Sequence, residues 1–163
     1  MKGLRRLKRS TSLAATLVVV ALLLVVVAAV GGHRAAQSAD ARTEALAAAK
    51  TRVPLLLTYR KSHLSEDLAN ALEQTTGSFT ADYSKILSQV VEPTARRRGI
   101  STTASVRAAG VVSGDRDAVV VLVFLTQATT ADGHRSSVSG SRVEVTLDRV
   151  AGDAWKIAGL RPV

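Results

Sequence analysis

The longest apolar stretch of the chain lies near its N-terminus and reads LAATLVVVALLLVVVAAV over residues 13–30. It extends from Leu13 through Val18 and Leu23 to Val30, and Thr16 alone interrupts the alanine, valine and leucine. At 1.5 Å per residue, a helix of this length measures about 27 Å, close to the roughly 30 Å of hydrocarbon in a bilayer. The pattern predicts a transmembrane helix over residues 13–30.

The charges on the two sides of this predicted span differ. The leader, residues 1–12, holds no acidic residue, and its basic residues are Lys2, Arg5, Arg6, Lys8 and Arg9. The residues directly after the span carry acidic and basic groups in equal number. The positive-inside rule therefore places the N-terminus in the cytoplasm and the C-terminal part outside the cell membrane, as a single-pass protein. The alternative is a cleaved signal peptide ending at Ala29-Val30-Gly31, whose apolar region is usually about 7–15 residues long.

Alanine dominates the segment that follows, residues 31–57, and strong helix formers fill much of the rest. Its apolar stripe is thin, which is more typical of a stalk that leads away from a bilayer than of a core helix. Pro54 lacks a backbone donor and disfavours helical angles at Val53, so we expect a break or kink there.

Two further helices are expected before the pattern changes. Ser65 is a candidate N-cap, followed by apolar residues at helical spacing, and Gly77 is expected to end this short helix. The strongest amphipathic pattern comes next and consists of Phe79, Tyr83, Ile86, Leu87, Val90 and Val91. Pro93 interrupts it, and Gly99 follows a cationic last turn.

From residue 100 onward the pattern is that of β-strands. The run from Val119 to Leu125 is apolar without alternation, which favours a central strand covered on both faces. Val143, Val145 and Leu147 alternate with polar residues, as in a half-buried strand. Short turns separate the strands, so they should be antiparallel. The prediction is an α+β domain over residues 58–163, with helices packed on a curved antiparallel sheet of about four strands.

Composition narrows the classes of function. From His33 onward, 17 basic residues oppose 13 acidic ones, which is weak support for nucleic acid, and the chain has few aromatic residues for base stacking. The chain has no cysteine, so an exported domain must be held by its core, and thiol chemistry is excluded. The three histidines have no metal-ligand spacing, and no GxSxG nucleophile motif occurs. We expect no enzyme activity, no metal and no cofactor.

A few polar residues remain candidates for a site. Asp82, Tyr83 and Asp148 could face the interior, although a solvated or capping role suits the two carboxylates and a core position suits the ring. The candidate interface residues are Arg96, Arg97, Arg98 and Trp155. The arginines could meet anionic lipid or an acidic partner, or simply form a solvated helix end. Trp155 could anchor an interface or close the core beside Ile157.

Several stretches together resemble the actinobacterial Mce-associated membrane proteins, which have an NTF2-like or SnoaL-like cone domain. These stretches are Asp67-Leu68-Ala69, Thr76 to Phe79 with Tyr83, Val106 to Phe124, Thr126 to Thr130, Ser141-Arg142-Val143 and Leu160 to Val163. The resemblance covers residues 40–163. Pro54 and Arg60-Lys61 depart from the family pattern, which as a rule has a continuous helix and acidic residues there.

The resemblance implies a non-enzymatic, anchored accessory subunit that stabilises a mammalian-cell-entry importer of lipids or sterols. Its partners would be the lipid bilayer and other membrane proteins, and a homo-oligomer is an open alternative. A SnoaL-like enzyme or small-ligand-binding protein is a second hypothesis, and it would require an ionisable residue inside an open cone. A third is an assembly factor resembling the NTF2-like periplasmic domain of type IV secretion systems.

Overall fold

A computed structural model describes residues 36–132 and 136–163 of the chain. The chain divides into two units, Met1–Gln37 and Ser38–Val163, and the account below concerns the second. The predicted leader and transmembrane helix lie outside the described residues. Within the described residues, no helix has the length and apolarity needed to span a membrane.

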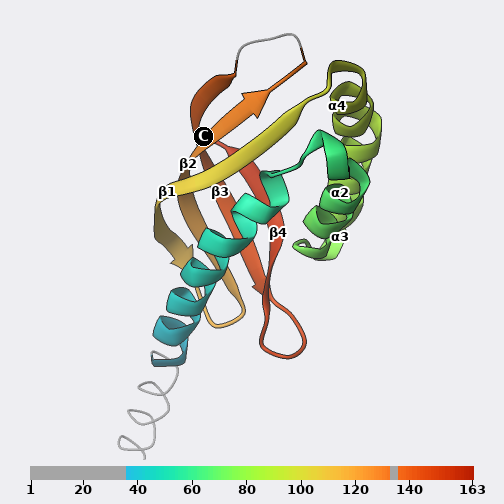
Figure 1. Ribbon diagram of the computed structural model, residues 1–163. Coiled ribbons are helices and arrows are strands. Elements are labelled where there is room, and N and C mark those ends of the chain that lie inside the picture. Colours follow the sequence, from blue (N-terminus) through green and yellow to red (C-terminus); the bar gives the residue numbers. More distant parts are fainter. Residues whose placement is uncertain (1–35, 133–135) are drawn as a thin grey trace, which may run out of the picture. The chain divides into compact units, whose positions relative to one another are not determined.

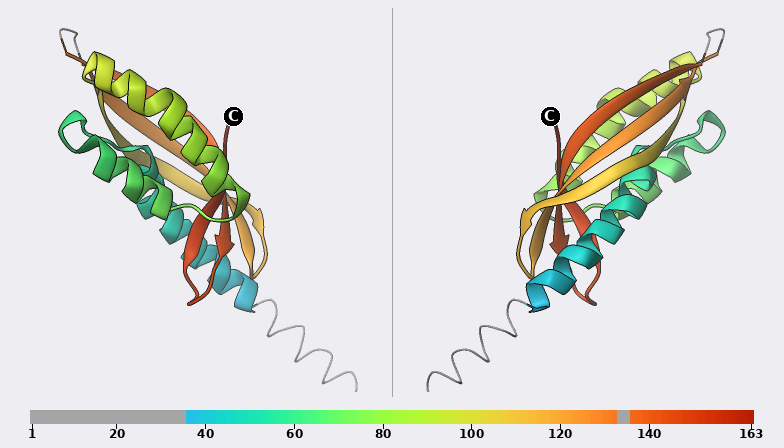
Figure 2. Two further views of the ribbon diagram at one scale, coloured as in Figure 1. Left: turned by 90° about the vertical axis from the view of Figure 1, so that its right-hand side faces the viewer. Right: turned by 90° about the vertical axis from the view of Figure 1, so that its left-hand side faces the viewer.

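The helices precede the strands along the chain, as the sequence predicts. The helical segments are a first helix over residues 36–57, the short turn η1 (Lys61–His63), α2 (Leu64–Glu73), α3 (Gly77–Ile86), the π-helical η2 (Leu87–Val91) and α4 (Glu92–Arg98). The strands are β1 (Ser101–Gly114), β2 (Ala118–Thr130), β3 (Ser137–Arg149) and β4 (Trp155–Pro162). They pair antiparallel in the order β1-β2-β3-β4, with the helices to one side of the sheet (Figures 1 and 2). The predicted α+β class with a four-stranded antiparallel sheet is confirmed.

The first helix contributes to the main core, so the stalk interpretation of its apolar stripe is wrong for the described residues. Its buried residues recur mostly at four-residue intervals and are Ala41, Ala45, Ala49, Val53 and Leu56. They belong to the same cluster as the buried side chains of β2, β3 and β4. Alanine has little area to bury, but a row of small residues allows a helix backbone to approach the sheet closely. The stripe is therefore thin and still forms a packed face.

The helix does not break at Pro54 but continues to residue 57. A proline at this position leaves the carbonyl of Lys50 without its usual amide donor. Lys50 is exposed, so water can take the place of that donor. The helix ends three residues beyond the proline, and Tyr59 there pairs with Thr102 at the start of β1 through two backbone hydrogen bonds of 2.9 and 2.8 Å.

The second helical region starts and ends differently from the prediction. Residue His63 precedes α2 as its N-cap, while Ser65 lies inside the helix and accepts a hydrogen bond from Arg96. Gly77 begins α3 with φ of 63° instead of ending α2. The amphipathic helix from Phe79 onward is present, and it passes Pro93 through η2 and α4 without interruption. Gly99 ends it in the left-handed conformation, as predicted.

Strand β2 is an interior strand, but it is not covered on both faces. Val119, Val121, Val123 and Leu125 are buried under the helices, whereas the alternate residues Val120 and Leu122 are only half-buried and Phe124 is exposed. An unbroken apolar run predicted cover on each side. In this protein the run supplies one core face and one apolar face that the described residues leave uncovered.

A β-bulge at Arg107 changes the register of β1 against β2. Before the bulge, Thr102, Ala104 and Val106 face the core, and after it Ala109 and Val111 do so. The extra residue moves the core-facing positions from even to odd numbers. The strand therefore lacks a simple alternation in its sequence, and the side chain of Arg107 is placed beside the uncovered face.

Candidate interaction surface

On the helix-covered side, Tyr83 is a structural residue that joins two helices. Its hydroxyl donates a hydrogen bond of 2.8 Å to the carbonyl oxygen of Leu56. Its ring stacks on Phe79 with 5.5 Å between centroids. Burial raises the pKa of the Tyr83 phenol far above its ordinary value, so the group keeps its proton at physiological pH. It is suited to hold α3 against the end of the first helix.

Trp155 lies in the core, with 4% of its surface exposed, in agreement with the core alternative and not with an exposed interface. Its indole Nε1 donates to Oε2 of Glu44 at 3.2 Å, and Arg149 donates to the same oxygen at 2.9 Å. The guanidinium of Arg149 also lies over the indole ring, 4.7 Å from the ring centroid. This cluster joins the first helix to β3 and β4.

A second polar cluster joins α2 to the segment before it. Asp67 is buried, and its carboxylate accepts from the backbone N–H of Arg60 at 2.8 Å and from the Arg60 guanidinium at 3.0 and 2.7 Å. Because the Arg60 side chain bonds to the charged carboxylate, the pKa of Asp67 is lowered from its usual value. Such a bidentate pair fixes the turn that leads into α2.

The three arginines predicted as an interface are exposed at the end of α4, but they are not equivalent. Arg96 bonds to Glu92 Oε1 with its Nε at 3.1 Å and its Nη2 at 2.7 Å. It also donates to the hydroxyl of Ser65 at 2.8 Å. Arg96 therefore holds α4 against α2, and only Arg97 and Arg98 extend from this end without an ion pair among the described residues.

The other candidates do not converge on a site. Asp82 is exposed and lies 3.8 Å from Lys85, and Asp148 is half-buried in β3. His63 occupies the N-cap position of α2 without a side-chain capping hydrogen bond, whereas His33 and His134 lie outside the described residues. Within residues 36–132 and 136–163, no group of three metal-ligating side chains comes together. Each buried side-chain polar atom described there has a hydrogen-bond partner.

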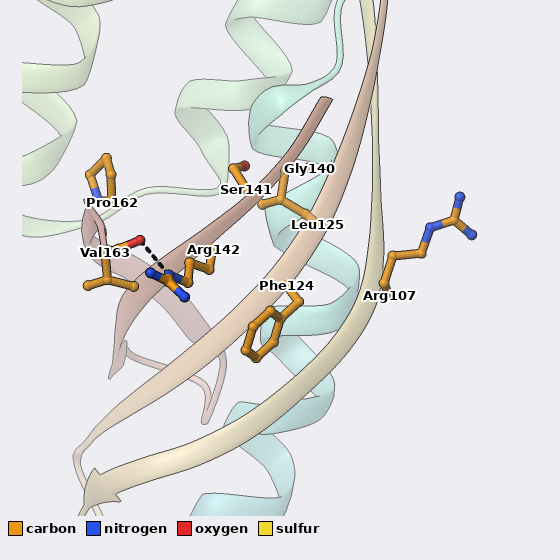
Figure 3. Close-up of a pocket in the computed structure, with 8 residues that line it drawn as sticks. All are labelled: Arg107, Phe124, Leu125, Gly140, Ser141, Arg142, Pro162 and Val163. Atoms are coloured by element: carbon orange, nitrogen blue, oxygen red, sulfur yellow. Dashed lines mark hydrogen bonds between the residues drawn. The ribbon is translucent and has the colours of Figure 1, made fainter. Parts of the chain in front are cut away.

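The surface that stands out is the uncovered face of the sheet. A groove of about 620 Å³ lies on it, formed by the middle of β1, β2 and β3 and the end of β4. Its lining includes Arg107, Phe124, Gly140, Arg142, Pro162 and Val163, shown in Figure 3. Phe124 and Arg142 are directly opposite each other on β2 and β3, and Arg107 stands apart on β1 (Figure 3).

Two local features give this groove its shape. Gly140 has open space where a Cβ would lie, so the backbone of β3 is accessible at that point. Arg142 donates through Nε to the carbonyl oxygen of Val163 at 2.8 Å, which fixes the end of β4 beside it. Arg107 donates through Nε to the hydroxyl of Thr126 at 3.1 Å, which holds its side chain against β2.

Sequence reasoning did not predict this groove, although the apolar residues that form part of it are visible in the sequence of β2. The outward residues of β2 are apolar, and they were interpreted as covered instead of exposed. Periodicity distinguishes a one-sided strand from a two-sided one only when the outward residues are polar. Whether an aromatic side chain on an interior strand is exposed depends on whether a second layer covers that face of the sheet, and the sequence pattern does not show this.

No family model matches the chain. It is 36% identical over 126 residues to "Outer membrane protein Rv1973" of Mycobacterium tuberculosis, an alignment that spans 77% of this chain and 78% of that protein. It is 38% identical over 120 residues to "Uncharacterized protein Rv1362c" of the same organism, across 73% of this chain and 54% of that protein.

Solved structures share the fold at low sequence identity. An IcmL-like type IV secretion system protein from Legionella pneumophila superposes with a TM-score of 0.65 at 11% identity, over 75% of this chain and 91% of that one. A periplasmic fragment of TraM gives 0.61 at 12% identity, over 74% and 95%. The VirB8 protein of Agrobacterium tumefaciens gives 0.58 at 9% identity, over 72% and 88%. At these identities the likeness concerns the fold alone.

Proposed function

This chain belongs to the family of the Mycobacterium tuberculosis outer membrane protein Rv1973, and we propose that it is a membrane-associated accessory protein that acts by protein contact in the cell envelope. The name of that relative supports membrane association. The apolar run at residues 13–30 supports a single-pass anchor with the described unit outside the cytoplasm.

The observation that carries the proposal is the different placement of the structural polar clusters and of the residues that line the groove. The buried polar clusters of the described unit, around Tyr83, Trp155 and Asp67, hold its elements together. On the uncovered sheet face, by contrast, an exposed aromatic ring and two arginines line a groove. Aromatic residues and arginine are the types enriched at protein interfaces. This arrangement is suited to binding a partner and supports a role without enzyme activity.

The specific assignment is to an importer of the mammalian-cell-entry type, which the accessory protein would stabilise during lipid or sterol uptake. The support for it is the resemblance of residues 40–163 to Mce-associated membrane proteins. The second candidate is an assembly factor for a secretion-type complex. That candidate is favoured by the fold shared with an IcmL-like type IV secretion system protein and with CagV, a VirB8 homologue of a type IV secretion system.

Affinity capture of the full-length protein from its native membrane, after crosslinking, tests both candidates. Recovery of mammalian-cell-entry proteins with their permease would support the importer role. Recovery of a secretion ATPase and its partners would support the assembly role instead. Recovery of this protein alone, under conditions in which a known envelope complex from the same membrane stays intact, would contradict both.

A further inference from the structure

The uncovered face of the sheet exposes apolar side chains on an interior strand. Phe124 has 43% of its surface exposed although β2 is an interior strand. Along the same side of β2, Val120 and Leu122 are half-buried, and the β1 residues opposite Leu122 and Phe124 are Gly110 and Ala108. The small residues leave the larger side chains accessible from the solvent. An aromatic ring in such a depression is a typical anchor point for a partner side chain.

The charged side chains that line the groove are of one sign. Two arginines, Arg107 and Arg142, line the groove, and none of the described residues that line it is Asp or Glu. Neither arginine pairs with a carboxylate side chain of a described residue; Arg107 donates through Nε to the Thr126 hydroxyl, and Arg142 donates through Nε to a main-chain oxygen of Val163, the last residue of the sequence. The carboxylate in the next row of β3, Glu144, is paired with Arg161. The terminal nitrogens of two arginines thus remain for a ligand with carboxylates.

A second copy of the chain does not fit this charge pattern. In a two-fold dimer the same patch occurs on both subunits, so Arg107 and Arg142 of one copy would approach those of the other. Like charges brought together in this way oppose association. The residues that line the groove come from all four strands (Figure 3), so a ligand that fills it would cross from β1 to the end of β4.

We infer that the groove at Phe124 binds an acidic polypeptide segment of a partner protein, with an apolar side chain on Phe124 and carboxylates on Arg107 and Arg142. This inference rests on the proposed function, because it names the surface and the partner chemistry of the protein contact. The aromatic ring supplies affinity, and the two arginines on different strands select the sign of the charge and fix the direction of the segment.

A library of random short peptides, displayed on phage and selected against the full-length protein in zwitterionic nanodiscs, tests the inference. The wild-type protein should enrich peptides that combine Asp or Glu with an aromatic or aliphatic residue. Arg142→Glu or Phe124→Ser should lower the affinity for an enriched peptide at least tenfold. The matched control Arg116→Glu changes an exposed arginine in the β1–β2 turn and should leave the affinity within twofold.

The decisive arm is a selection against the double variant Arg107→Glu, Arg142→Glu, which should enrich Lys and Arg in place of Asp and Glu. A purely structural role of the arginines would not invert the selected charge. Thermal unfolding checks that each variant is folded, and the arginine variants suffice if Phe124→Ser is not. Failure to enrich acidic peptides, or the same enrichment against both proteins, would overturn the inference. So would a change in oligomeric mass of Phe124→Ser, which would indicate a second copy as the occupant.

The two proposals can fail separately. Capture of the same envelope partners by wild-type protein and by Arg142→Glu would retain the proposed function and remove this surface from it. Selection of acidic peptides in an Arg142-dependent manner, by a protein that is recovered alone from its membrane, would retain the surface and remove the role in an envelope complex.

Discussion

At the scale of single residues, the polar side chains of the described unit divide by what they contact. Tyr83 and Glu44 join elements that are distant in the sequence, whereas Asp67 pairs with Arg60 seven residues before it. Their partners are a guanidinium, a backbone carbonyl and an indole, and none of these pairings has a local sequence pattern. Sequence reasoning could therefore name Tyr83 as a core residue, but it had no basis for finding the Asp67 pair or the Glu44 cluster.

Asp67 gives the first prediction, because its pKa is lowered in the folded protein by the Arg60 side chain. Its contribution to stability is complete above the pKa of an unfolded aspartate, roughly 3.9, and is lost as the pH falls through the lower folded value. Asp67→Asn should lower the free energy of unfolding by about 1–2 kcal/mol at neutral pH. Thermal unfolding of both proteins across pH 7 to pH 2 should show the difference shrinking at acid pH. A constant difference, or a similar loss in the exposed control Asp82→Asn, would contradict this account.

At the scale of elements, the sequence was most informative where large apolar side chains recur. The four strands were predicted because Val, Leu and Ile recur at their buried positions, whereas in the helix from Phe79 onward Leu87 is buried but Ile86 and Val90 of the same predicted apolar pattern are exposed. The first helix was misjudged because alanine marks a buried position and an exposed one alike. Glycine was similarly ambiguous, since Gly77 begins α3 and Gly99 ends α4, both at positive φ.

The packing of the first helix gives the second prediction. Ala45 is completely buried against the sheet, whereas Ala47 is exposed on the same helix. Ala45→Leu should lower the free energy of unfolding by about 1–3 kcal/mol, because the added methylenes have no space beside the sheet. Ala47→Leu has the same helix propensity change and should have little effect. Equal unfolding midpoints in urea for the two variants would restore the stalk interpretation.

A buried position of β2 and an exposed position of β1 give the third prediction. Val121→Asp places a carboxylate without a partner in the core and should abolish cooperative unfolding. Val112→Asp, at an exposed position of β1, should leave a folded protein with a similar unfolding midpoint. The measurement is near-ultraviolet circular dichroism with thermal melts. A well-folded Val121→Asp protein would show that the assignment of the core face is wrong.

At the scale of the whole molecule, the described unit has one side that is closed and one that is open. Helices and buried polar pairs complete the side facing the first helix. The opposite side of the same sheet has an exposed Phe124, and Arg107 and Arg142 line the groove beside it. This asymmetry could not be predicted from the sequence, because the apolar residues on both sides of β2 are of the same kind. The asymmetry arises because the alanine-rich first helix and the other helices pack on one face of the sheet, and no described element packs on the other.

The proposed topology gives the last prediction, and the absence of cysteine from the chain makes its test clean. Single-cysteine variants Ser10→Cys in the leader and Ser78→Cys in the exposed first turn of α3 should differ in intact cells. A membrane-impermeant maleimide should label Ser78→Cys at once and Ser10→Cys only after the membrane is opened, since the positive-inside rule keeps the leader in the cytoplasm. Labelling of both in intact cells would contradict that orientation. A Ser10→Cys protein that stays unlabelled after lysis, with a mass lower by the leader and span, would instead establish the cleaved signal peptide.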